Sequence, residues 1–191
     1  MAVLTGILLA AGRGRRFDPA GARNKLLQTL PGGEPVVVAS ARHLLACLPR
    51  VVAVVPPSDG GVGDILRGLG CEVTVCPEAD TGMGASLVRA IRHSLPAEGW
   101  LVALGDMPFV TPDTLAALRD AVVNGAGIAV PAYRGRRGNP VAFAACHREA
   151  LLEMTGDQGA RRLQQAHPVT EIVVPDPGIL RDIDTPSDLP V

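Results

Sequence analysis

The sequence predicts an α/β fold with three layers, in which a mostly parallel sheet lies between two layers of helices. Two observations lead to this prediction. Strand-length apolar runs alternate with segments of helical periodicity through residues 1–131, and these runs are apolar on both faces, as in parallel strands covered by helices. The arrangement is Rossmann-like, with an extended C-terminal lid region. Because ligands of such sheets bind at the carboxyl ends of strands, we expect functional residues in the loops that follow them.

The expected elements follow one another in a regular order. Met83 begins a helical face that continues through Leu87, Ala90, Ile91 and Ser94, and this face runs into a strand. The segment 111–113 reads Thr-Pro-Asp, which is typical of a helix start. We expect strands at 3–9, 51–55, 72–76, 100–104 and 128–131, and helices at 36–47, near 64–69, over 83–94 and from 112 onward.

The pattern changes after residue 131. We expect a Gly/Arg-rich loop at 132–139, a short strand at 140–143, short helices at 146–154 and 159–166, and late or edge strands at 170–174 and 180–183. This last third is expected to extend the sheet and to form a substrate lid. No linker divides the 191 residues, so we expect a single domain.

Composition excludes several classes of partner. The 18 basic and 19 acidic residues nearly cancel and only 3% of residues are aromatic, so we expect no binding to nucleic acid. The cysteines form no C-x-x-C pair and the histidines are scattered, which argues against zinc. No segment has the length of a membrane span, and the apolar N-terminus lacks the basic start of a signal peptide. We therefore expect a cytoplasmic protein without membrane contact and with a small anion as its partner.

A glycine-rich basic loop follows the first strand. Gly12 and Gly14 allow an anion to approach the backbone closely, and Arg13, Arg15, Arg16 and Lys25 supply cationic donors in the segment that follows. The loop lacks the third glycine of a dinucleotide fingerprint and does not match a Walker A loop. We interpret it as a phosphate loop of another kind. Its structural alternative is a solvated basic turn.

Two acidic residues complete the candidate site. Asp106 directly follows the strand expected at 100–104, and Asp184 precedes a Thr-Pro pair typical of a helix start. Each alone has a structural explanation, as a turn or cap residue. Together, facing a cationic phosphate loop, they suit Mg²⁺, which takes one or two carboxylates and fills its shell with phosphate oxygens and water. Mn²⁺ is the alternative cation.

Five motifs in order resemble the nucleotidyltransferases of the molybdenum cofactor type, especially the cytidylyltransferase branch, over essentially the whole chain. They are L-A-A-G with the downstream Arg, Phe and Lys (9–25), G-M-G-x-S-L (82–87), G-D-M-P (105–108), G-D-x-G-A-R (156–161) and D-I-D-T-P-x-D-L (182–189). The chain departs from the family in two places. The interval between Arg16 and Lys25 is longer than in many members, and Asn139 stands where many relatives carry histidine.

The resemblance implies a fold of the nucleotide-diphospho-sugar transferase type and transfer of a nucleoside monophosphate from an NTP to a phosphorylated acceptor, with release of pyrophosphate. It implies catalysis by Arg16, Lys25, Asp106 and Asp184, the two aspartates holding the metal. Residues 1–131 would form the nucleotide-binding half and 132–191 the part that binds the acceptor and completes the metal site. The remaining implied nucleotide-binding residues are Leu9, Ala10, Ala11, Gly12, Gly14, Gly82, Gly84 and Ser86, and the implied acceptor-binding residues are Gly138, Asn139, Pro140, Asp157 and Gly159.

The resemblance also bears on the substrates. Ala11 stands where guanylyl members usually carry glycine, and its methyl group narrows the space for a purine, which favours CTP. Molybdopterin is the implied acceptor, with a client molybdoenzyme or its chaperone as protein partner. Three alternatives stay open: GTP as the nucleotide, a sugar phosphate or other phosphorylated acceptor, which Asn139 motivates, and a non-catalytic protein that binds or delivers the cofactor. Segments 82–86, 135–139 and 156–161 also have structural explanations, as a helix start, a solvated hairpin and a turn.

Overall fold

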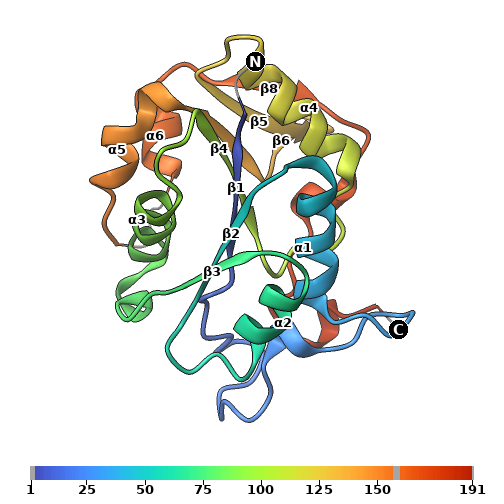
Figure 1. Cartoon of the computed structure of the whole chain (residues 1–191). Coiled ribbons are helices and arrows are strands. Elements are labelled where there is room, and N and C mark those ends of the chain that lie inside the picture. The colour runs from blue at the N-terminus through green and yellow to red at the C-terminus, as the bar shows by residue number, and fades with distance from the viewer. Residues whose placement is uncertain (1–2, 157–159, 191) are drawn as a thin grey trace.

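A mixed, mostly parallel sheet runs through the centre of the molecule and carries helices on both faces (Figure 1). The computed structural model describes residues 3–156 and 160–190. The strand order is β3-β2-β1-β4-β7-β5, with β6 and β8 both paired to β5. The predicted three-layer fold is confirmed. The strands are β1 (Thr5–Leu9), β2 (Val51–Val55), β3 (Glu72–Val75), β4 (Gly99–Leu104), β5 (Ile128–Tyr133), β6 (Arg136–Arg137), β7 (Val141–Ala144) and β8 (Thr170–Val173).

The helices form two layers. One face of the sheet carries α1 (Val36–Cys47), α2 (Val62–Gly68) and α4 (Pro112–Val123), and the other carries α3 (Met83–Ser94), α5 (Arg148–Leu152) and α6 (Arg161–Ala166), as Figure 1 shows. Short 3₁₀ helices lie at Lys25–Leu27, Ala79–Thr81, Ala145–His147, Pro177–Leu180 and Pro186–Asp188. Within 3–156 and 160–190, no helix is both long enough and apolar enough to cross a membrane.

Alternation along the central strands builds a separate core on each face of the sheet. In β1, Leu8 packs into the core shared with α1, α2 and α4, whereas Ile7 and Leu9 pack into the core shared with α3, α5 and α6. All five residues of β1 are buried, which explains the continuous apolar run in the sequence. The central strand is therefore fixed from both sides, and its carboxyl end is a rigid base for the loop that follows.

The parallel strands β1, β2, β3 and β4 bring their carboxyl ends to one edge of the sheet. Leu9 at the end of β1 lies beside Leu104 at the end of β4. The backbone N–H of Gly105 then donates to the carbonyl of Leu9 at 2.9 Å. The glycine-rich loop and the segment carrying Asp106 thus leave the sheet side by side.

The last third of the chain extends the sheet, as expected, but two of its elements differ from the prediction. The loop expected at 132–139 is wrong, because β5 continues to Tyr133 and Arg136–Arg137 returns as β6. Arg134 and Gly135 between them have φ of 49° and 75°, the conformation that suits a tight hairpin. The strand expected at 180–183 is also wrong. A 3₁₀ helix, Pro177–Leu180, ends there, and Asp176 caps it by accepting from the N–H of Gly178.

The other late elements agree with the prediction. The strand expected at 170–174 is β8, which pairs parallel to β5, and the strand expected at 140–143 is β7, which lies antiparallel between β4 and β5. The helix expected at 146–154 is a 3₁₀ turn followed by α5, and the one expected at 159–166 is α6, with residue 159 outside the described part of the chain.

Candidate active site

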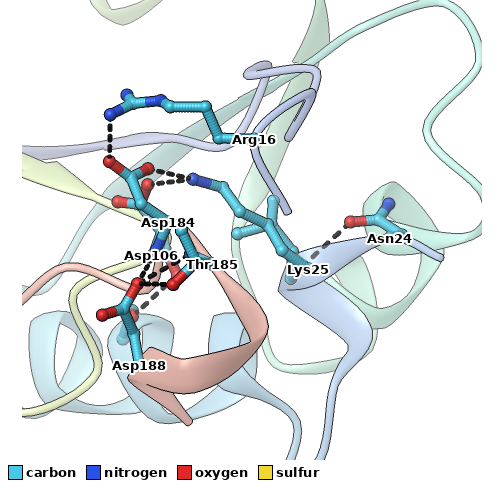
Figure 2. Close-up of polar contacts among 10 residues, drawn as sticks. Arg16, Asn24, Lys25, Asp106, Asp184, Thr185 and Asp188 are labelled. Atoms are coloured by element: carbon cyan, nitrogen blue, oxygen red, sulfur yellow. Dashed lines mark hydrogen bonds and ion pairs between the residues drawn. The ribbon is translucent and has the colours of Figure 1, made fainter. Parts of the chain in front are cut away.

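Three charged side chains meet at the carboxyl edge of the sheet. The ammonium group of Lys25 lies 2.6 Å from Oδ2 of Asp106 and 3.1 Å from Oδ1 of Asp184. Arg16 reaches the other oxygen, Oδ2, of Asp184 at 2.8 Å. Figure 2 shows the lysine pointing at both carboxylates while the arginine approaches Asp184 from the far side. All four residues that the sequence assigns to catalysis are therefore in one cluster.

Local structure in the first loop brings Lys25 to this position. Asn24 caps the 3₁₀ helix that begins at Lys25, since its side-chain oxygen accepts from the N–H of Leu26 at 3.0 Å and its amide donates to the carbonyl of Asp59 at 3.1 Å. Gly14 has φ of 58°, and a Cβ atom there would come to 3.4 Å from Cγ of Lys25. The long interval after Arg16 therefore folds back, and the lysine reaches the carboxylates.

The segment carrying Asp184 is joined to the segment carrying Asp106 through the backbone. The N–H of Ile183 donates to the carbonyl of Asp106 at 2.9 Å. After the site, Asp188 accepts from the N–H groups of Asp184 and Thr185 and from the Thr185 hydroxyl, at 2.7 to 3.1 Å. Asp188 therefore holds the turn that presents Asp184 (Figure 2).

The charge balance of the cluster keeps Lys25 protonated. Only 8% of Lys25 is exposed, and this burial opposes the charged form, but the carboxylates of Asp106 and Asp184 outweigh it and raise the pKa of Lys25 above its usual value. Nearby, burial and then the carboxylate of Asp184 raise the pKa of Asp182. At the centre of the site, one buried ammonium group faces two carboxylates, and the exposed guanidinium of Arg16 balances the remaining negative charge.

A pocket of about 310 Å³ lies between the glycine-rich loop and the start of α3. It is lined by eight of the residues that the sequence assigns to the nucleotide: Leu9, Ala10, Ala11, Gly12, Lys25, Gly82, Ser86 and Asp106. Arg13 and Arg15, which the sequence analysis names as cationic donors of the phosphate loop, line it as well, and so do Asp80 and Met83, to which it gave no binding role. An ion pair between Arg13 and Asp80 joins the two sides. The basic character of the loop was the signal for the two arginines, and Met83 belongs to the G-M-G-x-S-L motif, whereas Asp80 lies outside every motif.

A second pocket, of about 740 Å³, lies between β7 and α6. Gly138 and Asn139, to which the resemblance gives a role in acceptor binding, line it. Arg137, Arg161 and Arg162 line it too and give it a basic wall that the sequence analysis did not assign to the site. Leu9, Met83 and Leu104 line both pockets. The two spaces therefore adjoin at the carboxyl ends of β1 and β4.

The remaining residues predicted from the sequence that the structure describes do not line the two pockets, and some of them contact residues that do. Gly14 and Arg16 are not among the residues lining either pocket, and Arg16 is largely exposed apart from its contact with Asp184. Gly84 packs against the backbone at Gly156, where its N–H donates to the Gly156 carbonyl at 2.9 Å. Pro140, preceded by a cis peptide bond, lines a small pocket near α1 and α4. Asp157 and Gly159 lie outside the described residues.

The chemistry of Asp106 and Asp184 fits a divalent cation. Their side chains are 19% and 21% exposed, and both carboxylates already face the ammonium group of Lys25, with Arg16 as a second cation on Asp184. Across the described residues no group of three or more His, Cys, Asp or Glu is placed to hold a metal. Two carboxylates are enough for Mg²⁺ when phosphate oxygens and water complete its shell. The donor set therefore suits a metal that arrives with a phosphorylated ligand.

Comparison with known proteins gives a family match and relatives that include two of similar length to this chain. Residues 6–171 match the model of the MobA-like NTP transferase domain. This match ends before Asp184, which the structure joins to Asp106. Purine catabolism protein PucB of Bacillus subtilis is 29% identical over 97% of this chain and 93% of its own length. A probable molybdenum cofactor guanylyltransferase of Mycobacterium ulcerans is 30% identical over 98% of this chain and 92% of its own.

Two solved structures resemble the whole chain. A nucleotidyl transferase from Methanothermobacter thermautotroptrophicus superposes with a TM-score of 0.82 at 25% identity, covering 97% of this chain and 94% of that one. Rv0371c from Mycobacterium tuberculosis, in complex with manganese, superposes with a TM-score of 0.79 at 27% identity, covering 97% and 95%.

Proposed function

This chain belongs to the MobA-like NTP transferase family and is a nucleotidyltransferase, and we propose that it transfers CMP from CTP to the terminal phosphate of molybdopterin with Mg²⁺. One observation carries the proposal. The pocket lined by the glycine-rich loop and the basic pocket between β7 and α6 adjoin, and Asp106 lines the first of them while its carboxylate shares Lys25 with Asp184. Two anionic substrates bound in these pockets would meet at the charged cluster. Family membership argues against a purely non-catalytic delivery protein.

The proposed reaction needs positioning and charge neutralisation more than proton transfer. An oxygen of the acceptor's terminal phosphate attacks the α-phosphorus of CTP and forms the new P–O bond. The bond from the α-phosphorus to the oxygen bridging to the β-phosphate breaks, and its electron pair leaves with pyrophosphate. The attacking phosphate is already an anion, so no general base is required. Electrostatic stabilisation of the charge that develops is then the main contribution.

We assign the nucleotide side to residues 1–131. Arg16 and Lys25 bind the triphosphate, and the backbone of the loop at Ala10, Ala11 and Gly12 lies against the nucleoside, with Gly82 and Ser86 opposite. Gly14 and Gly84 shape this side from behind, by supporting Lys25 and by seating α3. Asp106 and Asp184 would hold a Mg²⁺ ion, which would neutralise part of the phosphate charge, and Mn²⁺, present in the Rv0371c complex, is the alternative.

We assign the acceptor side to residues 132–191. Arg137, Arg161 and Arg162 give its pocket the charge that a phosphorylated ligand needs, and Gly138 and Asn139 form the part nearest β7. Residues 182–188 complete the metal site. A sugar phosphate or another phosphorylated metabolite is the second candidate acceptor, because Asn139 stands at a position where the resemblance leads one to expect histidine. A client molybdoenzyme or its chaperone stays a prediction from that resemblance.

The base preference is proposed from Ala11. This residue lines the nucleotide pocket and is only 5% exposed, so its methyl group occupies space that glycine would leave free. GTP is the second candidate nucleotide, since the Mycobacterium ulcerans relative carries a guanylyltransferase name. Ala11 is the residue that favours CTP here.

Pyrophosphate release tests the proposal. Purified protein is incubated with Mg²⁺ and each of CTP, GTP, UTP and ATP, with molybdopterin or a panel of sugar phosphates as acceptor. We expect CTP with molybdopterin to give the highest kcat/KM and Asp106→Ala to lower it by about a thousandfold, because the variant loses one of the two metal-binding carboxylates. Asp113→Ala, which removes an exposed carboxylate at the start of α4, is the matched control. A higher kcat/KM with GTP than with CTP would overturn the assignment of the nucleotide. A higher kcat/KM with a sugar phosphate than with molybdopterin would overturn the assignment of the acceptor.

A further inference from the structure

Lys25 occupies a place that a metal ion would otherwise take. It is the only lysine among the 18 lysine and arginine residues of the chain, and its ammonium group lies between Asp106 and Asp184 at 2.6 and 3.1 Å. Its side chain is 9% exposed. A compact ammonium ion resembles a bare metal cation more closely than the broad, planar guanidinium of arginine does. The free protein therefore already holds one cation between its two metal-binding carboxylates.

We propose that Lys25 is a built-in substitute for the metal, and that it exchanges the two carboxylates for the nucleotide's triphosphate only when metal and nucleotide bind together. This inference rests on the proposed metal site at Asp106 and Asp184. It adds a prediction about how that site is filled. Free metal binds the empty protein weakly, whereas the metal–nucleotide complex binds it tightly.

Electrostatics supports the exchange. A divalent ion bound to both carboxylates would stand within a few ångströms of the ammonium group, where like charges repel strongly in a partly buried site. Lys25 would have to leave, and a buried cation without a partner is costly. Arg16, the other cation on Asp184, is 78% exposed, so it stays hydrated when it leaves the carboxylate and turns toward the triphosphate. Lys25 lines the nucleotide pocket, so the triphosphate is the anion positioned to receive it.

The exchange makes metal and nucleotide mutually dependent. The nucleotide stabilises the ammonium group after it has left the carboxylates, and the metal neutralises those carboxylates after the ammonium group has gone. By linkage, each ligand must then raise the affinity for the other by the same factor. Removing the ammonium group should break this coupling and let metal bind alone.

Manganese binding provides the first test. Free Mn²⁺ is titrated by electron paramagnetic resonance against the wild type, Lys25→Met and Arg23→Met. We expect Lys25→Met to bind Mn²⁺ at least about tenfold more tightly than the wild type, because a unit positive charge leaves the site. Arg23→Met removes the same charge from the same loop but has no contact with either carboxylate: Arg23 pairs with Asp18 and stacks on Phe17. Its Mn²⁺ affinity should stay within about twofold of the wild type.

The single lysine allows a second test on the unaltered protein. Lysine labelled with ¹³C at Cε and ¹⁵N at Nζ gives one side-chain resonance, which reports directly on this ammonium group. We expect millimolar Mg²⁺ alone to leave the resonance near its free position, and Mg²⁺ with CTP to move it. If Mg²⁺ alone produces the full shift, the exchange does not depend on nucleotide and the inference is wrong. This measurement is decisive even if Lys25→Met folds poorly.

A double variant separates the inference from the function on which it rests. If Lys25→Met binds Mn²⁺ no more tightly than the wild type, the exchange is wrong and the metal site itself is unaffected. If Lys25→Met binds tightly and Asp106→Asn added to it abolishes that binding, both proposals hold. If the double variant binds as tightly as Lys25→Met, the metal lies elsewhere, and both the exchange and the metal assignment fail.

Discussion

Neighbouring alanines in the glycine-rich loop face different parts of the molecule. Ala10 packs with the core on the α1, α2 and α4 face, and Ala11 packs with the core on the α3, α5 and α6 face. Both are nearly buried and both line the nucleotide pocket. A single methyl group at either place therefore supports one core and also limits the volume of this pocket.

This geometry predicts that Ala11→Gly changes nucleotide choice. Removing the methyl group should lower the ratio of kcat/KM for CTP over GTP by about tenfold, which is typical of one methylene at a selective pocket, and should cost about 1 kcal/mol of stability. Steady-state pyrophosphate assays with both nucleotides measure the ratio. Ala53→Gly is the matched control: its methyl group is buried in β2 and does not line this pocket, so we expect a similar stability loss and an unchanged ratio. An unchanged ratio in Ala11→Gly would remove the case for CTP.

Single residues were predictable where the chain itself determines their place. Asp106 follows a buried strand, and the end of a parallel strand points to the ligand edge, so its position could be read from the sequence. The contacts of Lys25 could not. They depend on the Asn24 cap, on the fold-back at Gly14 and on Asp184, which lies 159 residues further along the chain. Sequence patterns report local structure, and these contacts are tertiary.

At the scale of elements, the N-terminus of α3 is seated on a turn from the far end of the chain. The N–H of Gly84 donates to the carbonyl of Gly156, and a Cβ atom at Gly84 would lie 2.9 Å from that oxygen and 3.0 Å from the carbonyl carbon of Thr155. Ser86, two residues after Gly84 in the first turn of α3, lines the proposed nucleotide pocket. The close contact between Gly84 and the backbone at Gly156 therefore fixes the position of the first turn of α3, which forms one wall of the pocket.

We expect Gly84→Ala to destabilise the protein by about 1–3 kcal/mol, because a backbone carbonyl cannot move aside as a flexible side chain can. Urea unfolding measures the change. Gly68→Ala, in the last turn of α2, is the matched control: a Cβ atom there meets nothing within 4 Å, so the better helix propensity of alanine should stabilise the protein by about 0.5 kcal/mol. Equal effects of the two substitutions would show that the contact at Gly156 carries no strain.

Elements with strong periodicity were predictable, and those fixed by a few turn residues were not. The stripes of α3 and α4 and the apolar runs of β1, β2 and β4 stand out in the sequence because each buries a regular set of side chains. The hairpin of β5 and β6 turns at Arg134 and Gly135 and bears a polar, basic β6, so its composition reads as a loop. The 3₁₀ helix Pro177–Leu180 is too short for a periodic signal.

At the scale of the whole molecule, residues 176–184 form what we call the return path. This segment leads from the start of α4 to the carboxyl edge of the sheet and places Asp184 beside Asp106. Asp176 anchors it to α4. Asp176 is 4% exposed, and its carboxylate accepts from the N–H and hydroxyl of Thr111, the hydroxyl of Thr114 and the N–H of Gly178, at 2.7 to 3.0 Å. The start of a helix and the start of the return path therefore share one buried carboxylate.

Asp176→Ala should cost about 3 kcal/mol, because it leaves several buried donors without an acceptor. Without the Asp176 carboxylate the return path should become more mobile, and Asp184 would then be held less firmly. We therefore expect kcat to fall even at temperatures at which the protein stays folded. Trp100, the only tryptophan in the chain and buried in β4, reports unfolding by its fluorescence. The control, Asp113→Ala, removes an exposed first-turn carboxylate of the same helix and should cost no more than about 1 kcal/mol. A loss equally small for Asp176→Ala would mean that the return path is anchored elsewhere.

The bond between the N–H of Ile183 and the carbonyl of Asp106 joins main-chain atoms only. A main-chain hydrogen bond does not depend on the side chains of Asp106 and Ile183. It therefore holds Asp106 and Asp184 close together even when the sequence between them changes. Residues 132–182, nearly all of the proposed acceptor side, lie in that interval. We expect evolution to have been free to exchange one acceptor pocket for another on a constant catalytic frame, and the same junction marks where a designer would graft a new acceptor loop.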